Sequence, residues 1–218
     1  MAVILFKLTT RSRPAHMYRA YRSVVDYARQ QWVMIVSIDS DDTDTVNSPE
    51  LVAMKRDQRV TVIQGTSKNK VDAINRDVPA SGWDILVNLS DDQIFTKGDF
   101  DKVITDNCGL DTFLHLPDGH VNELLPTMSI MGYDYYNRFG YIYHTDYASL
   151  FCDNEAMDVS IELNRHVYVN EIVFDHLHPA WYGGPIDKQL EHTQNFYRQD
   201  EKTYNKRKSL GFPKFSIY

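Results

Sequence analysis

Short apolar segments alternate with helix-like segments along the first half of the chain, and this alternation constrains the fold more than any other feature. The expected strands are residues 3–8, 32–38, 60–63 and 83–89. The expected helices between and after them are residues 14–28, 50–57, 68–77 and 98–106. Units this short imply right-handed crossovers, so the pattern predicts a mainly parallel sheet flanked by helices, as in an α/β protein.

The second half of the chain follows a different pattern. Residues 111–147 contain strand-like pieces rich in Tyr, Gly and Asn, without a clear helical stripe. We expect a helix over residues 154–163, short strands over 167–169 and 172–174, and a long polar helix over 189–210. At 218 residues, the chain has the length of a single domain with a C-terminal helical extension.

The charge of the chain narrows the partners that fit it. Its 30 acidic and 23 basic residues give a net charge of −7, which does not favour nucleic acid as a partner. A basic cluster near the C-terminus keeps a local nucleic-acid contact open, although a solvated helix face is the simpler explanation. The members of this cluster are Lys202, Lys206, Arg207, Lys208 and Lys214.

The apolar runs and the cysteines bear on the cellular setting. No apolar run approaches the roughly 20 residues that a membrane span needs. The opening apolar run, residues 2–6, is too short for a signal peptide, so we expect it to belong to a strand. Two cysteines, Cys108 and Cys152, provide neither a disulfide framework nor a zinc site. We therefore expect a reducing, cytoplasmic setting.

Polar side chains gather where the expected strands end. In parallel sheets, ligands bind beyond the carboxyl ends of the strands. The polar residues at these ends, or at the helix start that follows, are Thr9, Thr10, Arg11, Arg13, Asp39, Asp41, Asp42, Lys68, Lys70, Asp91 and Asp92. The cations suit a phosphate group near helix N-termini. Ordinary turn and surface chemistry is the alternative for each group taken singly.

The pair Asp91 and Asp92 ends the fourth expected strand. Neighbouring side chains on extended backbone point to opposite faces, so these two carboxylates can serve two partners. One partner would be a hard cation and the other a sugar hydroxyl. A solvated turn at a helix start is the competing interpretation.

Two histidines lie in the run FDHLHPAW. On extended backbone His176 and His178 share a face, and Pro179 favours the extended state for His178. Neutral imidazole is a common metal ligand, and together with Asp92 it would suit Mn²⁺ or Mg²⁺. A structural role for the histidines has equal weight.

Two acids, Asp153 and Glu155, lie in CDNEAM near the start of an expected helix. Either residue would serve as a general base, and a helix-capping role explains either one equally well. Aspartate is the better N-cap, because its short side chain reaches the N–H groups two or three residues on. We therefore expect Asp153 to cap the helix and Glu155 to be the base.

The motifs taken together resemble the family 2-like glycosyltransferases with the nucleotide-sugar-binding GT-A fold, especially small enzymes of phages and bacteria. They occur in the order LTTRSRP, SIDSDDTD, GTSKNKVDAIN, ILVNLSDDQIF, CDNE, FDHLHPAW and FYRQDEKTYNKRKSLGF. The resemblance spans most of the chain, and residues 111–132 contribute little to it. It implies a Rossmann-like sheet in one domain, with a nucleotide-binding half (1–107) and an acceptor- and metal-binding half (108–218).

The resemblance also implies roles for individual residues. Asp39 would contact the base, uracil, and Asp91 the ribose, within a nucleotide site that also includes Thr9, Thr10, Arg11, Arg13, Asp41, Lys68 and Lys70. Asp92 and His178 would hold Mn²⁺ or Mg²⁺, and Glu155 or Asp153 would deprotonate the acceptor hydroxyl. The signature here is Ser90-Asp91-Asp92 and not a literal Asp-x-Asp. This departure leaves open which acid holds the metal.

The implied activity is metal-dependent, inverting transfer from a UDP-sugar. The acceptor would be a glycan, a lipid-linked sugar, a protein or a modified nucleobase. Two other classes of protein remain open. A nucleotidyltransferase that makes a nucleotide sugar shares this sheet layout, but it would carry a Gly-rich loop after its first strand, and TTRSRP has no glycine. The third class is a non-catalytic protein that binds a sugar or a nucleotide.

Overall fold

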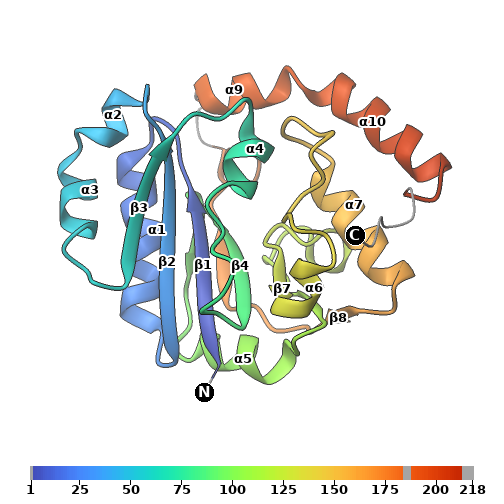
Figure 1. Cartoon of the computed structure of the whole chain (residues 1–218), viewed down its shortest axis with the longest axis horizontal. Helices are drawn as coiled ribbons and strands as arrows, with labels where there is room; N and C mark the ends of the chain where they lie inside the picture. The colour runs from blue at the N-terminus through green and yellow to red at the C-terminus, as the bar shows by residue number, and fades with distance from the viewer. Residues whose placement is uncertain (1, 184–187, 213–218) are drawn as a thin grey trace.

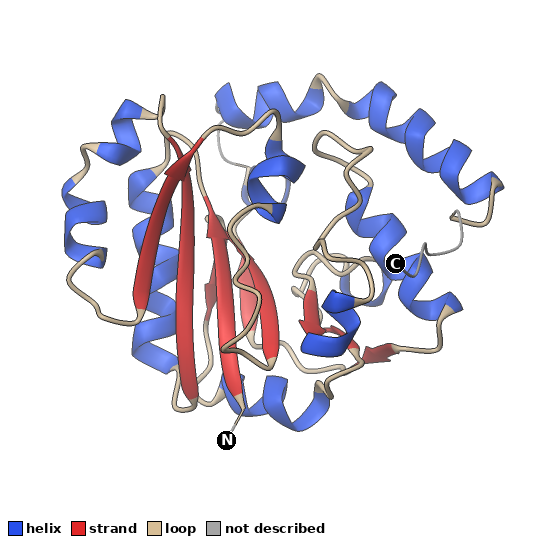
Figure 2. Cartoon of the chain, viewed as in Figure 1, coloured by secondary structure: helices blue, strands red, loops and turns tan. Residues whose placement is uncertain are grey.

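The computed structural model describes residues 2–183 and 188–212, and it confirms the α/β architecture (Figures 1 and 2). Its centre is a seven-stranded sheet in the order β3-β2-β1-β4-β7-β6-β8. The four parallel strands are β1 (Val3–Thr9), β2 (Gln31–Asp39), β3 (Val60–Gly65) and β4 (Ile85–Ser90). These are the four strands that the sequence predicts, within a few residues at each end.

The other half of the sheet is shorter and mixed in direction. It consists of β6 (Phe113–His115), β7 (Ile130–Gly132) and β8 (His166–Tyr168). Strand β7 runs antiparallel to both β4 and β6, whereas β8 is parallel to β6. A separate two-stranded sheet pairs β5 (Gln93–Phe95) with β9 (Phe174–His176) in antiparallel fashion. The strand expected over 172–174 therefore begins two residues later, where it can pair with β5.

Helices cover both faces of the main sheet. Buried side chains of α1 (Pro14–Tyr27), α3 (Pro49–Met54) and α5 (Phe100–Asn107) pack on one face. Side chains of α4 (Lys70–Asn75), α6 (Tyr133–Asn137) and α7 (Cys152–Glu162) pack on the other. Local signals set several helix starts, because Pro14 and Pro49 occupy first-turn positions and Asn69 accepts a bond from the Asp72 N–H.

Several helices also differ from the sequence prediction. The short helix α2 (Thr43–Val46) follows β2, and α6 lies in the segment for which no helix was expected. The long helix expected over 189–210 is two helices, α9 (Lys188–Gln194) and α10 (Tyr197–Ser209). The N–H groups of Asn195 and Phe196 bond only three residues back, and this tighter turn ends α9. The remaining short helices are η1 (Asn122–Leu124) and α8 (Pro179–Tyr182).

The described residues contain no helix that is both long and apolar enough to cross a lipid bilayer. Cys108 and Cys152 are free thiols, and both are buried.

Lys7 is a charged residue in the middle of β1, and its side chain is fully buried. Its Nζ donates to Ser37 Oγ at 2.7 Å, to the Ala73 carbonyl at 3.1 Å and to Thr9 Oγ1 at 3.2 Å. Burial lowers the pKa of Lys7 to about 7, and the nearby Asp77 carboxylate only partly opposes this shift.

This depressed pKa predicts a pH-dependent stability. The ordinary pKa of lysine is 10.5, so between pH 7 and 10.5 the unfolded chain binds more protons than the folded one. The free energy of unfolding of the wild type, relative to Lys7→Met, should therefore rise with pH, by up to about 1.4 kcal/mol per pH unit. Urea unfolding at pH 7, 8 and 9 measures this difference. Parallel pH profiles for the two proteins would contradict it.

Candidate functional site

A cleft of about 1010 Å³ opens at the carboxyl ends of the parallel strands. Thr9 in β1 pairs with Ser37 in β2 and with Ser90 in β4, so these strand ends meet at one edge of the sheet. Residues 149–153 and residues of α8 and α9 complete the walls. Figure 1 shows α9 over this edge of the sheet, next to α4, and α10 continuing over α7.

The cleft collects nearly all the residues that the sequence singles out. Those lining it are Thr9, Thr10, Arg11, Arg13, Asp39, Asp41, Lys68, Lys70, Asp91, Asp92, Asp153 and His178. Glu155 does not line it. Parallel strand ends and the start of α4 explain why residues as far apart in the sequence as Thr9 and Asp92 come together.

Asp91 and Asp92 face different partners, although they lie in the turn between β4 and β5 and not on the extended backbone that the sequence analysis assumed. Asp91 is buried, accepts a bond from Thr10 Oγ1 at 2.7 Å, and lies 3.3 Å from Arg13 Nη1. Burial raises the pKa of Asp91, and the neighbouring Asp92 adds to this effect. Asp92 has one oxygen, Oδ1, that is buried and has no hydrogen-bond partner among the described residues.

His176, which the sequence analysis considered with His178 as a possible metal ligand, contacts two carboxylates in the structure. Its Nε2 lies 3.5 Å from Asp92 Oδ2, and its Nδ1 lies 3.5 Å from Asp118 Oδ2. Burial alone would lower the pKa of His176, but the two carboxylates outweigh it and raise this pKa to about 9. Asp118 is itself fixed, since its Oδ1 accepts the N–H groups of His120 and Val121. The imidazolium thus holds Asp92 in place.

His178 has a different local role from the one expected. It is the N-cap of α8, and its Nδ1 accepts the Ala180 N–H at 3.2 Å. Burial lowers the pKa of His178, with a smaller contribution from His176, so the ring is neutral near pH 7. A neutral ring that accepts at Nδ1 carries its proton on Nε2, and a protonated nitrogen cannot bind a metal. Metal ligation by His178 would therefore require the cap to break.

The helix α7 begins earlier than the sequence suggests, and this changes the expected roles of its two acids. The N-cap is Phe151 and not Asp153, whose Oδ1 accepts only the adjacent Asn154 N–H at 2.9 Å. Residues two apart on a helix point about 200° apart, so Asp153 and Glu155 face opposite ways. Asp153 faces the cleft, and burial raises the pKa of its carboxyl.

The carboxylate of Glu155 is occupied by structural contacts, and this geometry does not favour its expected role as the base. Arg207 donates to it twice, from Nε to Oε2 at 2.7 Å and from Nη2 to Oε1 at 2.8 Å. Tyr147 OH donates to Oε2 at 2.7 Å as well. Only Asp153 of the two acids can reach a molecule bound in the cleft.

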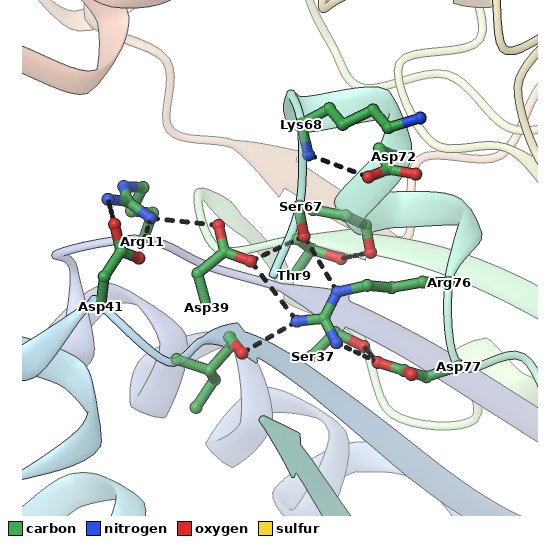
Figure 3. A network of polar contacts seen from close by, with 12 residues as sticks. Thr9, Arg11, Ser37, Asp39, Asp41, Ser67, Lys68, Asp72, Arg76 and Asp77 are labelled. Atoms are coloured by element: carbon green, nitrogen blue, oxygen red, sulfur yellow. Dashed lines mark hydrogen bonds and ion pairs between the residues drawn. The ribbon is translucent and has the colours of Figure 1, made fainter. Parts of the chain in front are cut away.

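The end of the cleft next to the ends of β2 and β3, called the far end below, is shaped by Asp39 and its partners (Figure 3). Arg11 forms a bidentate pair with Asp41, with both bonds at 2.8 Å, and also donates to Asp39 Oδ2 at 3.0 Å. Ser67, which the sequence analysis did not select, donates to Asp39 Oδ1 at 2.6 Å. This end of the cleft therefore presents an oriented carboxylate.

Known structures with this architecture were found by comparison of folds. No protein-family model and no curated protein matches the chain by sequence. The mannosyltransferase PcManGT from Pyrobaculum calidifontis, solved with GDP-Man and Mn²⁺, has a TM-score of 0.66 and 13% identity over 97% of this chain and 65% of its own. S. aureus TarS 1–349 in complex with UDP has a TM-score of 0.61 and 12% identity, covering 80% of this chain.

A third similar structure is glucosyl-3-phosphoglycerate synthase from Mycobacterium tuberculosis with Mg²⁺ and UDP, at a TM-score of 0.56 and 15% identity. It covers 88% of this chain and 78% of its own. These neighbours are glycosyltransferases of the GT-A type. This chain has the GT-A fold. It spans about 60% of the length of the TarS fragment.

In this GT-A fold, the C-terminal helix α10 is tied to the wall that carries Asp153. Asp200 of α10 is fully buried, and its carboxylate accepts the N–H groups of Ala148, Ser149 and Leu150 at 2.8–3.0 Å. Arg207, about two turns further along the same face of α10, holds Glu155 of α7. The wall of the cleft is thus fixed from behind by two buried carboxylates.

The pair Glu155–Arg207 should contribute more to stability than a surface pair does. Its side chains are 6% and 11% exposed, so Glu155→Gln leaves a largely buried guanidinium with only the exposed Asp146 as its charge partner. We expect a loss of about 3 kcal/mol in the free energy of unfolding. The control Lys208→Met breaks the exposed pair with Asp158 and should cost less than about 1 kcal/mol. Equal losses in urea unfolding would show that Glu155 is not a structural anchor.

Proposed function

We propose that this chain is a glycosyltransferase that moves a sugar from a nucleoside diphosphate sugar, with UDP-sugars as the first donors to test, to an acceptor hydroxyl. The observation that carries this proposal is the content of one cleft. Among the described residues, it holds lysine side chains without a hydrogen bond or ion pair, a carboxylate oxygen without a hydrogen-bond partner, and a half-buried aspartate with a raised pKa. Each matches one requirement of transfer from an activated diphosphate.

The diphosphate would be bound by lysines at the start of α4. Within residues 2–183 and 188–212, the side-chain nitrogens of Lys68 and Lys70 make no hydrogen bond or ion pair, although both residues line the cleft. Lys70 interacts electrostatically with Asp91, Asp92 and Asp153, which places its charge near the centre of the site. A fixed cation there stabilises negative charge on a leaving diphosphate.

Asp92 fits a role as the protein ligand of Mn²⁺ or Mg²⁺. Its unpartnered Oδ1 is an oxygen donor of the kind that these hard cations prefer, and they often bind through one carboxylate together with substrate phosphates. The described residues contain no group of three acids, histidines or cysteines arranged to hold a metal by themselves. When bound, the cation would neutralise charge on the diphosphate. Asp91, already held by Thr10 and Arg13, would face the ribose.

Asp153 would be the general base. Its raised pKa brings the carboxylate closer to the value at which a base takes a proton efficiently near neutral pH. It would accept the proton of the acceptor hydroxyl as that oxygen attacks the anomeric carbon. One base and one displacement would invert the configuration at this carbon.

The similar structures support donor chemistry of this kind without fixing the donor. PcManGT was solved with GDP-Man and Mn²⁺, and TarS with UDP-GlcNAc. For the acceptor, a glycan, a lipid-linked sugar, a protein and a modified nucleobase all remain proposals. Nucleic acid is not favoured, because two members of the C-terminal basic cluster, Arg207 and Lys208, pair with Glu155 and Asp158 of the same chain.

Product detection distinguishes the proposed activity from its two alternatives. The chain is incubated with UDP-sugars and Mn²⁺ in the presence of candidate acceptors, and separately with UTP and sugar 1-phosphates. Release of UDP from the first mixture supports a glycosyltransferase. Release of pyrophosphate from the second would instead show a nucleotidyltransferase, and the absence of both products with retained UDP binding would show a binding protein.

A further inference from the structure

Arg76 lies directly behind the carboxylate at the far end of the cleft, and it does not line the cleft itself. Figure 3 shows its guanidinium between Asp39 and Ser67 on one side and Asp77 on the other. Its Nε donates to Ser67 Oγ at 2.9 Å, and its Nη2 donates to the Ile38 carbonyl at 2.8 Å and lies 3.6 Å from Asp39 Oδ1. Its Nη1 donates to Asp77 at 2.6 Å.

This arrangement fixes the direction of every hydrogen bond around Asp39. Ser67 Oγ accepts from Arg76, so its single proton is directed to Asp39. The side chain of Arg76 is 15% exposed. Its partner Asp77 is fixed in turn, because the Asp77 carboxylate also accepts a hydrogen bond from Ser37 Oγ at 2.7 Å. Ser37 in turn accepts from the buried Lys7. Hydrogen bonds therefore hold the guanidinium group of Arg76 on both sides.

Gly65 independently indicates that the end of β3 accommodates the guanidinium group of Arg76. A Cβ at Gly65 would lie 2.5 Å from Arg76 Nη1 and 3.1 Å from its Cζ. These distances are shorter than ordinary van der Waals contact. The end of β3 thus leaves room for Arg76 only because residue 65 has no side chain.

We propose that Arg76 is a positioning residue that, directly and through Ser67, aims the Asp39 carboxylate at the nucleobase of the donor and so determines base recognition. This rests on the proposed function, in which the cleft binds a nucleoside diphosphate sugar. A carboxylate offers four lone-pair sites, and Ser67 and Arg11 use two of them at Asp39. The remaining sites accept an N–H of a base. Uracil presents a ring N–H, whereas cytosine presents a ring nitrogen lone pair there, which a carboxylate repels.

The test measures UDP and CDP binding by calorimetry in the presence of Mn²⁺. Wild type should prefer UDP. Arg76→Ala should weaken UDP binding by about tenfold or more while CDP binding changes little, so the preference narrows. Arg76→Lys keeps the positive charge but loses the planar guanidinium with its several N–H donors. It should therefore restore the thermal stability that Arg76→Ala loses, without restoring the preference for UDP over CDP.

Two further variants separate positioning from stability. Gly65→Ala retains all the polar groups but displaces the guanidinium, so it should narrow the preference as Arg76→Ala does. The control Arg59→Ala removes another arginine, which pairs with Asp57 and covers Trp32 outside the cleft, and should leave the preference unchanged.

If both Arg76→Ala and Gly65→Ala keep the wild-type preference for UDP over CDP, the role of Arg76 is overturned, whereas the proposed function still stands. If wild type binds no nucleoside diphosphate, whether UDP, CDP, GDP or ADP, the proposed function fails and the role of Arg76 fails with it.

Discussion

Asp153→Asn should lower sugar transfer by about 10²–10⁴-fold and leave UDP binding and the melting temperature close to those of the wild type. The size of the effect is the usual loss when a general base is removed. Binding should survive because Asp153 lies on α7, away from the Asp39 end of the cleft. Stability should survive because Asp153 accepts only one local backbone bond, which an amide oxygen can also accept.

The matched variant is Glu155→Gln on the same helix. Because Glu155 faces Arg207 and not the cleft, the folded fraction of this variant should keep a transfer rate within a few-fold of the wild type. Initial rates with a UDP-sugar, normalised to the folded fraction, make the comparison. An active Asp153→Asn beside an inactive but stable Glu155→Gln would reverse the assignment of the base.

Asp92→Ala should remove the strengthening of UDP binding by Mn²⁺. In the wild type we expect Mn²⁺ to tighten UDP binding by about tenfold or more, equivalent to about 1.4 kcal/mol, since the cation would bind both Asp92 and the diphosphate. The unpartnered Oδ1 of Asp92 is the reason, because it can accept a cation without first giving up a bond. Calorimetry with Mn²⁺ and with EDTA measures the difference.

Asp41→Ala is the control for this experiment. Asp41 also lines the cleft, but it is paired with Arg11 at the Asp39 end, so the metal enhancement should persist in this variant. Equal UDP affinity of the wild type in Mn²⁺ and in EDTA would refute metal-assisted binding. Loss of the enhancement in Asp41→Ala alone would move the metal to the other end of the cleft.

The sequence predicted the residues at the sheet edge because their position follows from local pattern. Apolar runs of strand length fix where β1, β2 and β4 end, and parallel strands bring those ends together. The residues that follow each run, such as Arg11, Asp39 and Asp91, therefore reach one cleft without any knowledge of distant contacts.

The roles of Asp153, Glu155 and His176 depend on contacts that no local pattern encodes. Glu155 meets Arg207, which lies 52 residues later on α10, and the capping argument could not anticipate that partner. His176 acquires its two carboxylates because β9 pairs with β5 and because the loop at Asp118 folds beneath it. Propensity and capping rules describe single segments, and these contacts arise between segments.

A crystal structure of the chain with UDP and Mn²⁺ tests the central claim most directly. We predict the uracil against Asp39 and Ser67, the diphosphate between Lys70 and Asp92, and Mn²⁺ on Asp92 Oδ1, with Asp153 facing the space beyond the diphosphate. A complex with UDP bound elsewhere, or a cleft that stays empty at millimolar UDP and Mn²⁺, would contradict the proposal that this cleft is the donor site of a glycosyltransferase.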